Sequence, residues 1–164
     1  MRSDEIITIS GKRGYGKTTL AKTILNKLSL ERVVVWDPMM EYNHINSYIP
    51  RRGDAEEFNN WLKALWLKGN VCIMVDEADQ VMAERKPLPE FANKIINLGR
   101  HRGIGMIMIT RRLANLNKTA VSQSATMFLF HHFISNDINY LKEMISDAES
   151  LIQLKKFQYK TYNL

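Results

Sequence analysis

The 164-residue sequence contains a single cysteine, Cys72, and no uninterrupted apolar run of the roughly 18 residues that a membrane-spanning helix requires. One cysteine excludes an internal disulfide bond, and its place in the apolar stretch VCIMVDE predicts a core side chain in a reducing compartment. The opening residues, MRSDEIITIS, lack the apolar segment of a signal peptide. We therefore expect a cytoplasmic protein without a membrane span, and the length suits a single domain over residues 1–164.

Acidic side chains are almost missing from the segment between Arg85 and Lys118. Eight lysine and arginine residues accompany one acid, Glu90, so this segment has a net charge of +7, compared with +6 for the whole chain. Such a segment is either a solvated face of the protein or a surface that binds a polyanion. Composition alone leaves both interpretations open.

Short apolar segments alternate with stretches of helical spacing, and this alternation indicates the fold class. Buried strands are expected at residues 6–10, 33–37, 71–76, 105–110 and 127–130, with one or two more in the closing segment. Helices are expected at 18–28, after an N-cap at Asp54, at 87–101 and at 137–148, with a loop at 39–54. The pattern predicts an α/β fold with a mostly parallel sheet flanked by helices and a C-terminal β-hairpin or edge strands.

The segment GKRGYGKT at residues 11–18 matches the phosphate-binding pattern G-x-x-x-x-G-K-[ST], and it lies between a predicted strand and a predicted helix. Glycines let backbone N–H groups turn toward phosphate oxygens, and the helix N-terminus adds its positive dipole end. Lys17 would reach the β- and γ-phosphates of ATP, and the Thr18 hydroxyl would bind Mg²⁺. The residues expected to contact the nucleotide are Gly11, Arg13, Gly14, Tyr15, Gly16, Lys17, Thr18 and Thr19.

Two carboxylates, Asp76 and Glu77, end the apolar strand that begins at Val71. Because a buried charge without a partner is costly, two acids at this position indicate a bound cation or another function. Asp76 would hold the Mg²⁺ shell and Glu77 would act as general base toward the attacking water. The alternative is that both acids cap the next turn. A glutamate that activates water favours hydrolysis of ATP. Phosphoryl transfer to a bound acceptor does not require such a residue.

At residues 99–116, GRHRGIGMIMITRRLANL, the chain resembles the HerA/FtsK group of P-loop ATPases, which pump double-stranded DNA through ring-shaped oligomers. The segment DPMMEY at 37–42 resembles the same group, and the likeness is greatest to the small genome-packaging ATPases of membrane-containing icosahedral viruses. The resemblance implies a RecA-like (ASCE) fold, a homo-oligomeric ring such as a hexamer, and double-stranded DNA as partner. It also implies capsid or portal-vertex contacts, in the host cytoplasm or at a virion vertex.

The resemblance further implies roles for residues around the predicted strand at 105–110. Thr110 would sense the γ-phosphate, although a threonine is also an ordinary strand former. The family's next residue is glutamine, and here it is Arg111, which would either add charge beside ATP or turn away to DNA. Arg100 would reach the ATP site of the neighbouring subunit, with Arg102 in reserve. The alternative for Arg100 is a helix C-terminal charge that favours the dipole.

Loops of a ring motor grip the DNA backbone without reading sequence, which gives the basic segment a function. The candidate DNA contacts are Arg85, Lys86, Arg111, Arg112 and Lys118, while Arg51 and Arg52 suit a solvated loop equally well. Aromatic residues are not interleaved with them, which favours duplex over single-stranded DNA. The rival interpretations are an ATP-dependent switch that binds a protein partner and a cellular or plasmid HerA-like DNA translocase.

Overall fold

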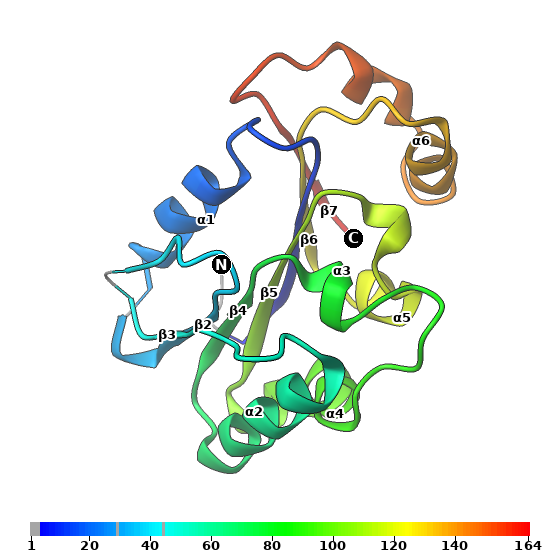
Figure 1. Cartoon of the computed structure of the whole chain (residues 1–164). Coiled ribbons are helices and arrows are strands. Elements are labelled where there is room, and N and C mark those ends of the chain that lie inside the picture. The colour runs from blue at the N-terminus through cyan, green and yellow to red at the C-terminus, as the bar shows by residue number, and fades with distance from the viewer. Residues whose placement is uncertain (1–3, 29, 44) are drawn as a thin grey trace.

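The computed structural model describes residues 4–28, 30–43 and 45–164, and a seven-stranded sheet runs through its centre (Figure 1). The strand order is β3-β2-β4-β5-β1-β6-β7, and all neighbours are parallel except β6 and β7. The strands are β1 (Ile6–Ser10), β2 (Val33–Trp36), β3 (Ser47–Tyr48), β4 (Cys72–Val75), β5 (Gly105–Thr110), β6 (Thr126–Leu129) and β7 (Lys160–Asn163). The prediction of a mostly parallel sheet flanked by helices is confirmed.

Helices cover both faces of this sheet. The α-helices are α1 (Lys17–Leu25), α2 (Ala55–Lys68), α3 (Ala78–Val81), α4 (Glu90–Leu98), α5 (Lys118–Ser122) and α6 (Ser135–Lys142). Short 3₁₀ helices are η1 (Leu30–Arg32), η2 (Gly99–Arg102), η3 (Leu113–Asn115) and η4 (Ala148–Gln153). Figure 1 shows α1 on one side of the sheet and α2 to α5 on the other. Within the described residues, no helix is both long and apolar enough to cross a bilayer.

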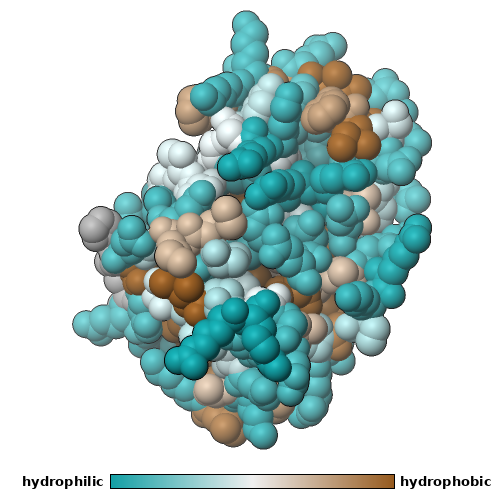
Figure 2. Space-filling model, viewed as in Figure 1, coloured by the Kyte–Doolittle hydropathy of each residue, from teal (hydrophilic) through white to brown (hydrophobic). Residues whose placement is uncertain are grey.

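Alternate side chains of the central strands belong to two separate apolar clusters, because successive residues of a strand point to opposite faces of the sheet. On the α1 face, Ile7 and Ile9 of β1 pack with Ile24 and Leu25. The buried thiol of Cys72 belongs to this cluster, and burial raises its pKa to about 12, which makes it a core side chain rather than a reactive one. On the face in Figure 2, hydrophilic side chains predominate and apolar ones form small separate patches.

Several element boundaries differ from the prediction. The loop expected at 39–54 contains the two-residue strand β3, which pairs with β2, and Tyr48 stacks on Trp36 with 5.4 Å between ring centroids. This segment also includes position 44, which lies outside the described residues. So short a strand depends on contacts with a distant segment, which local sequence does not encode.

The predicted helices at 87–101 and 137–148 were too long. In the first, residues before Glu90 are extended because Pro87 and Pro89 have no N–H to donate and disfavour helix in the residue before them. The helix then tightens into η2, and Gly103, with φ of 65°, ends that turn. In the second, α6 ends at Lys142, and the closing segment forms one edge strand, β7, after η4. The edge strand is confirmed.

Candidate nucleotide site

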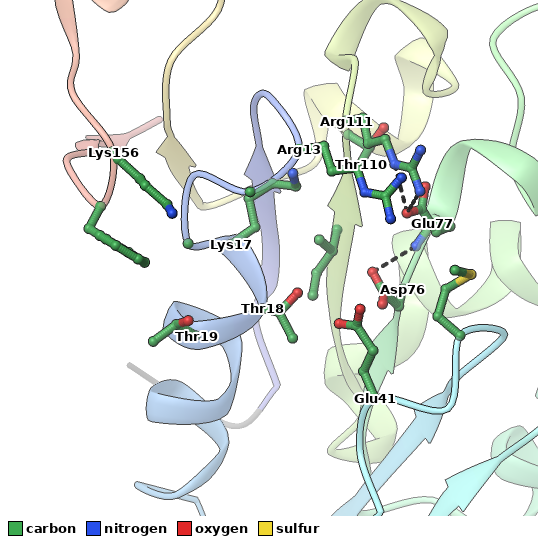
Figure 3. Close-up of a pocket in the computed structure, with 15 residues that line it drawn as sticks. Arg13, Lys17, Thr18, Thr19, Glu41, Asp76, Glu77, Thr110, Arg111 and Lys156 are labelled. Atoms are coloured by element: carbon green, nitrogen blue, oxygen red, sulfur yellow. Dashed lines mark hydrogen bonds and ion pairs between the residues drawn. The ribbon is translucent and has the colours of Figure 1, made fainter.

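Four loops meet at the carboxyl edge of the parallel strands and enclose a pocket of about 380 Å³. They follow β1, β2, β4 and β5, so the topology alone brings distant segments together, and ligands of open α/β sheets bind at this edge. Figure 3 shows Thr18, Asp76 and Glu41 pointing into the same space from three of these segments. The lining of the pocket includes six of the predicted nucleotide contacts, Arg13, Gly14, Gly16, Lys17, Thr18 and Thr19.

The loop between β1 and α1 has the geometry that its glycines predict. Gly14 and Gly16 have positive φ values of 77° and 107°, and Gly16 directly precedes the first turn of α1. The Lys17 ammonium donates hydrogen bonds to the carbonyl groups of Gly11 and Lys12, at 2.7 and 3.1 Å. Burial lowers the pKa of Lys17, and the charges of Glu77 and Asp76 oppose that shift. The result is a cation held against the loop by two of its backbone carbonyl groups.

Gly11 and Tyr15, which were also expected to contact the nucleotide, lie outside the residues that line the pocket. Gly11 supports the loop instead, since a Cβ there would come within 2.6 Å of Cβ of Phe130. The Tyr15 ring stacks on His131, with 4.8 Å between centroids, and so turns away from the pocket.

Asp76 and Thr18 fit a magnesium ion. Asp76 is 5% exposed, and burial raises its pKa to about 6, with the charges of Glu77 and Glu41 adding to the shift. Its Oδ1 atom accepts a hydrogen bond from the backbone N–H of Glu77 at 3.0 Å. A carboxylate crowded by other acids is stabilised by a divalent cation, and the Thr18 hydroxyl supplies a second hard oxygen in the same pocket.

The predicted general base, Glu77, forms an ion pair with the residue that replaces the family's glutamine. Nε and Nη2 of Arg111 donate to the same Glu77 oxygen, at 2.9 and 2.6 Å. The Glu77 backbone is left-handed, with φ of 50°, which is uncommon for a residue with a side chain. Arg111 therefore lines the pocket beside Glu77 and does not turn away from it (Figure 3).

Thr110 lies at the tip of β5 and lines the same pocket. It is 1% exposed, and its hydroxyl donates to Oδ1 of Asp79, on α3, at 2.8 Å. This bond joins the end of β5 to the helix that follows the two carboxylates. A change at Thr110 would therefore reach α3 directly.

Five lining residues were missed from the sequence: Met39, Glu41, Ile109, Lys156 and Phe157. The Asp37 carboxylate explains the first two, because it accepts hydrogen bonds from the backbone N–H groups of Glu41 and Tyr42, at 2.9 Å each, and folds that loop toward the pocket. The DPMMEY segment was the available signal for them. The alternating pattern of the closing segment predicts only strands and gives no signal for the last two.

Three of the predicted DNA contacts share a second hollow, of about 610 Å³, outside the nucleotide pocket. Arg85, Arg112 and Lys118 line it together with acidic residues, including Glu84 and Glu143. The Arg85 side chain is 95% exposed, whereas Arg112 forms an ion pair with the buried Asp137, at 3.2 Å. Lys86 lies next to this hollow, where its carbonyl accepts a hydrogen bond from the Asn117 side chain.

The two candidate arginines of η2 lie at the opposite edge of the sheet, since η2 precedes β5 and the phosphate-binding loop follows β1. Arg100 is exposed and lines a hollow beside Asp4 and Ile6, where β1 begins. Arg102 has a structural partner: its Nε donates to the carbonyl of Trp66, at 2.9 Å, and its guanidinium lies over the Trp66 ring. Arg102 thus stabilises the C-terminal end of α2.

The fold and this site define a P-loop nucleotide hydrolase. The model of the AAA domain family matches residues 1–115, so the chain belongs to that family, and it is an ATPase. A search of curated proteins with the sequence gives no match.

Solved structures extend the likeness to the whole chain. The genome packaging NTPase B204 from Sulfolobus turreted icosahedral virus 2, in complex with ATP-gammaS, is 20% identical, with a TM-score of 0.87 over 99% of this chain and 94% of that one. B204 from Sulfolobus turreted icosahedral virus, the DNA-packaging ATPase, is 22% identical, with a TM-score of 0.85 over 99% and 94%. The conjugation coupling protein TcpA of pCW3 is 14% identical, with a TM-score of 0.62 over 90% and 53%. The resemblance inferred from the sequence is confirmed at the level of the fold.

Proposed function

We propose that the chain is a genome-packaging motor that uses ATP hydrolysis to translocate double-stranded DNA. The observation that carries the proposal is the end-to-end likeness to B204, which covers 99% of this chain and 94% of that protein. B204 is described as a genome packaging NTPase. Because 94% of B204 aligns with this chain, almost all elements of its fold have a counterpart here. The setting that follows is a viral one, in the host cytoplasm or at a virion vertex, with capsid or portal-vertex proteins as further partners.

Within the pocket, the roles divide between the two ends of the phosphate-binding loop. Lys17 and the N-terminus of α1 bind the β- and γ-phosphates, and Thr18 and Asp76 hold Mg²⁺. When bound, the ion offsets the negative charge of the phosphates. Glu77 accepts a proton from the attacking water, and Thr110 links the γ-phosphate position to Asp79 of α3 through its 2.8 Å hydrogen bond.

Arg111 controls when Glu77 can act. In the ion pair, a single Glu77 oxygen accepts two charge-assisted hydrogen bonds, so that oxygen is not available to the attacking water. The γ-phosphate carries more negative charge than a carboxylate and competes for the same guanidinium. ATP therefore draws Arg111 away and frees Glu77, so that the base becomes available only when its substrate is bound.

Arg100 completes the site of a neighbouring subunit in a homo-oligomeric ring, a hexamer. It is exposed at the sheet edge opposite to the pocket of its own subunit, which suits delivery to a neighbour and not to itself. An arginine supplied in trans stabilises charge that develops on the γ-phosphate, and it makes hydrolysis depend on assembly. Each subunit contributes one domain over residues 1–164.

The hollow lined by Arg85, Arg112 and Lys118 is the proposed contact with the DNA backbone. Binding there is independent of sequence, because lysine and arginine contact phosphates and not base edges. Arg112 is an unsuitable test residue, since its removal would leave Asp137 buried without its ion pair. Arg85→Gln combined with Lys118→Gln should lower the slope of log affinity against log salt by about 0.9 for each phosphate that is no longer neutralised. The matched control, Lys63→Gln on the exposed face of α2, should leave the slope unchanged.

The experiment for the proposed function is the ATPase rate with and without duplex DNA, at two salt concentrations. A DNA motor should be stimulated several-fold by duplex DNA, and less so at high salt. Glu77→Gln should remove the rate in all conditions while ATP still binds. A slow rate that is indifferent to DNA would favour the rival function, an ATP-dependent switch that binds a protein partner.

A further inference from the structure

The closing segment of the chain covers one end of the nucleotide pocket. Lys156 and Phe157 form a turn between η4 and β7, and both line the pocket although they are far from the other lining residues in sequence. In Figure 3, Lys156 lies on the opposite side of Lys17 from Arg111 and Glu77. The pocket therefore has two ends, a catalytic one at Glu77 and one closed by this turn.

The phosphates fix the direction in which a nucleotide lies. Lys17 binds the β- and γ-phosphates, and Glu77 must be beside the γ-phosphate to activate water. The rest of the nucleotide then extends away from Glu77, past Thr19, which lines the pocket as the next residue along α1. Lys156 lies on that side of Lys17 in Figure 3, and Phe157, the next residue of the turn, lines the same pocket.

The turn is attached to that loop by specific contacts. The backbone N–H of Phe157 donates to the carbonyl of Tyr15, at 3.0 Å. The Phe157 ring lies against Gly16, because a Cβ on that glycine would come within 2.7 Å of the ring's Cδ1 atom. A loop movement at Tyr15 or Gly16 would therefore move the ring as well.

The backbone conformation and the exposure of Phe157 are both unfavourable for a phenylalanine, and a purely structural role explains neither. Its φ of 68° places a bulky residue in the left-handed region, and its side chain is 61% exposed. A phenylalanine that only supported the phosphate-binding loop would gain from burial of the whole ring. The Cδ1–Cε1 side of the ring packs on Gly16 instead, the Lys156 ammonium lies over the ring with Nζ 5.2 Å from its centroid, and the residue lines the pocket.

We infer that the Lys156–Phe157 turn is the nucleoside subsite of the ATPase, in which the Phe157 ring stacks on the base and Lys156 contacts the phosphate nearest to the ribose. Stacking uses the π-face that every base has. This subsite therefore favours a nucleotide over pyrophosphate but does not distinguish adenine from guanine. The inference rests on the ATPase activity of this site and not on DNA translocation, so the two can fail separately.

The test compares ligands that share two phosphates and differ in the nucleoside. Binding of ADP, GDP and pyrophosphate, each with Mg²⁺, is measured by calorimetry for the wild type and for Phe157→Leu. The variant should weaken the binding of ADP and GDP about tenfold and leave that of pyrophosphate unchanged. Removal of an aromatic ring that stacks on a base lowers the affinity for the nucleotide by about that factor. Lys156→Gln should weaken all three ligands. A control, Leu67→Ala, changes a residue of α2 that is 68% exposed and lies outside this pocket, and it should alter none of them.

A second variant guards against a folding defect. Phe157→Trp should retain ADP affinity, and its added fluorescence should be quenched by ADP and not by pyrophosphate. If Phe157→Leu weakens ADP and pyrophosphate equally, the turn only supports the phosphate-binding loop and the inference is wrong. Unchanged ADP affinity in Phe157→Leu, or an indole in Phe157→Trp that does not respond to ADP, would overturn it as well.

Discussion

At the residue scale, the ion pair between Arg111 and Glu77 is the feature that distinguishes this site from its family pattern, in which glutamine stands at position 111. A neutral glutamine could not neutralise the base, whereas Arg111 places two hydrogen bonds on one of its oxygens. In the proposed mechanism the guanidinium is shared between Glu77 and the γ-phosphate, so ATP and ADP should not be equivalent ligands. ADP has no γ-phosphate with which to compete.

Arg111→Gln should lower the affinity for ATP about tenfold and leave the affinity for ADP unchanged, since a charge-assisted contact to the γ-phosphate contributes about 1.5–3 kcal/mol. Glu77→Gln should do the reverse and tighten ATP, because it removes the competing carboxylate. Calorimetry with both nucleotides measures these ratios, with a non-hydrolysable ATP analogue for the active proteins. Equal losses for ATP and ADP in Arg111→Gln would show that this arginine does not read the γ-phosphate.

The buried carboxyl of Asp76 makes stability depend on pH. Its pKa is about 6 in the folded protein, against an ordinary value of 3.8, so the folded state holds a proton that the unfolded state has released between these values. Stability is thus lost as the pH rises from 4 to 6 and stays lower above 6. Asp76→Asn should raise the free energy of unfolding at pH 8 by roughly 1–3 kcal/mol without nucleotide, and the gain should vanish near pH 4. Thermal unfolding at several pH values measures this, and a gain that does not vary with pH would contradict it.

Sequence patterns identified the residues whose role depends on local geometry. Lys17, Thr18, Asp76 and Glu77 follow from motifs that span a few positions, and the structure brings them into one pocket. The pairing of Arg111 with Glu77 joins two strands and could not be predicted, because no local pattern links positions so far apart. Phe157 was missed for the same reason, since its pocket position depends on how the closing segment crosses the phosphate-binding loop.

At the scale of elements, the order of the strands in the sheet could not be predicted from the sequence, although five of the strands were predicted from their apolar runs. Strand β1 pairs with β5 and β6 and not with β2, its neighbour in the sequence, and only the packing of both faces determines such an order. Local capping, in contrast, was predictable: Asp54 caps α2 and accepts a hydrogen bond from the N–H of Glu57, at 2.8 Å.

The other end of α2 depends on Arg102, which reaches it from η2. Arg102→Ala removes the hydrogen bond to the Trp66 carbonyl and the contact with its ring, so it should cost about 1 kcal/mol of stability, or roughly 2–4 °C in Tm. The ATPase rate per folded molecule should stay near that of the wild type. Calorimetric melting and a rate assay separate the two effects, and a large loss of rate with an unchanged Tm would instead make Arg102 the arginine that acts in trans.

At the scale of the whole molecule, the pocket and Arg100 occupy opposite edges of one sheet. A subunit that carries its catalytic loop at one edge and an exposed arginine at the other suits head-to-tail assembly, in which each interface joins the two. Such assembly would make every ATP site depend on two subunits.

Arg100→Ala should bind ATP normally, form rings and hydrolyse about 10³-fold more slowly. Lys17→Ala should be inactive for a different reason, since its own phosphate-binding loop no longer carries the cation that holds the β- and γ-phosphates. A mixture of the two should regain activity, because some interfaces pair an intact phosphate-binding loop with an intact Arg100. The measurement is the ATPase rate across mixing ratios, and an inactive mixture in which mixed rings demonstrably form would rule out the role in trans.

The central claim is that the chain moves along duplex DNA as it hydrolyses ATP. The most direct measurement is the displacement of a labelled third strand from a triplex placed at one end of a duplex, because a translocating motor strips that strand as it passes. We predict displacement that requires ATP, depends on the length of duplex beside the triplex, and is absent in Glu77→Gln. DNA-stimulated ATP hydrolysis in assembled rings with no displacement from either end of the duplex would contradict the claim.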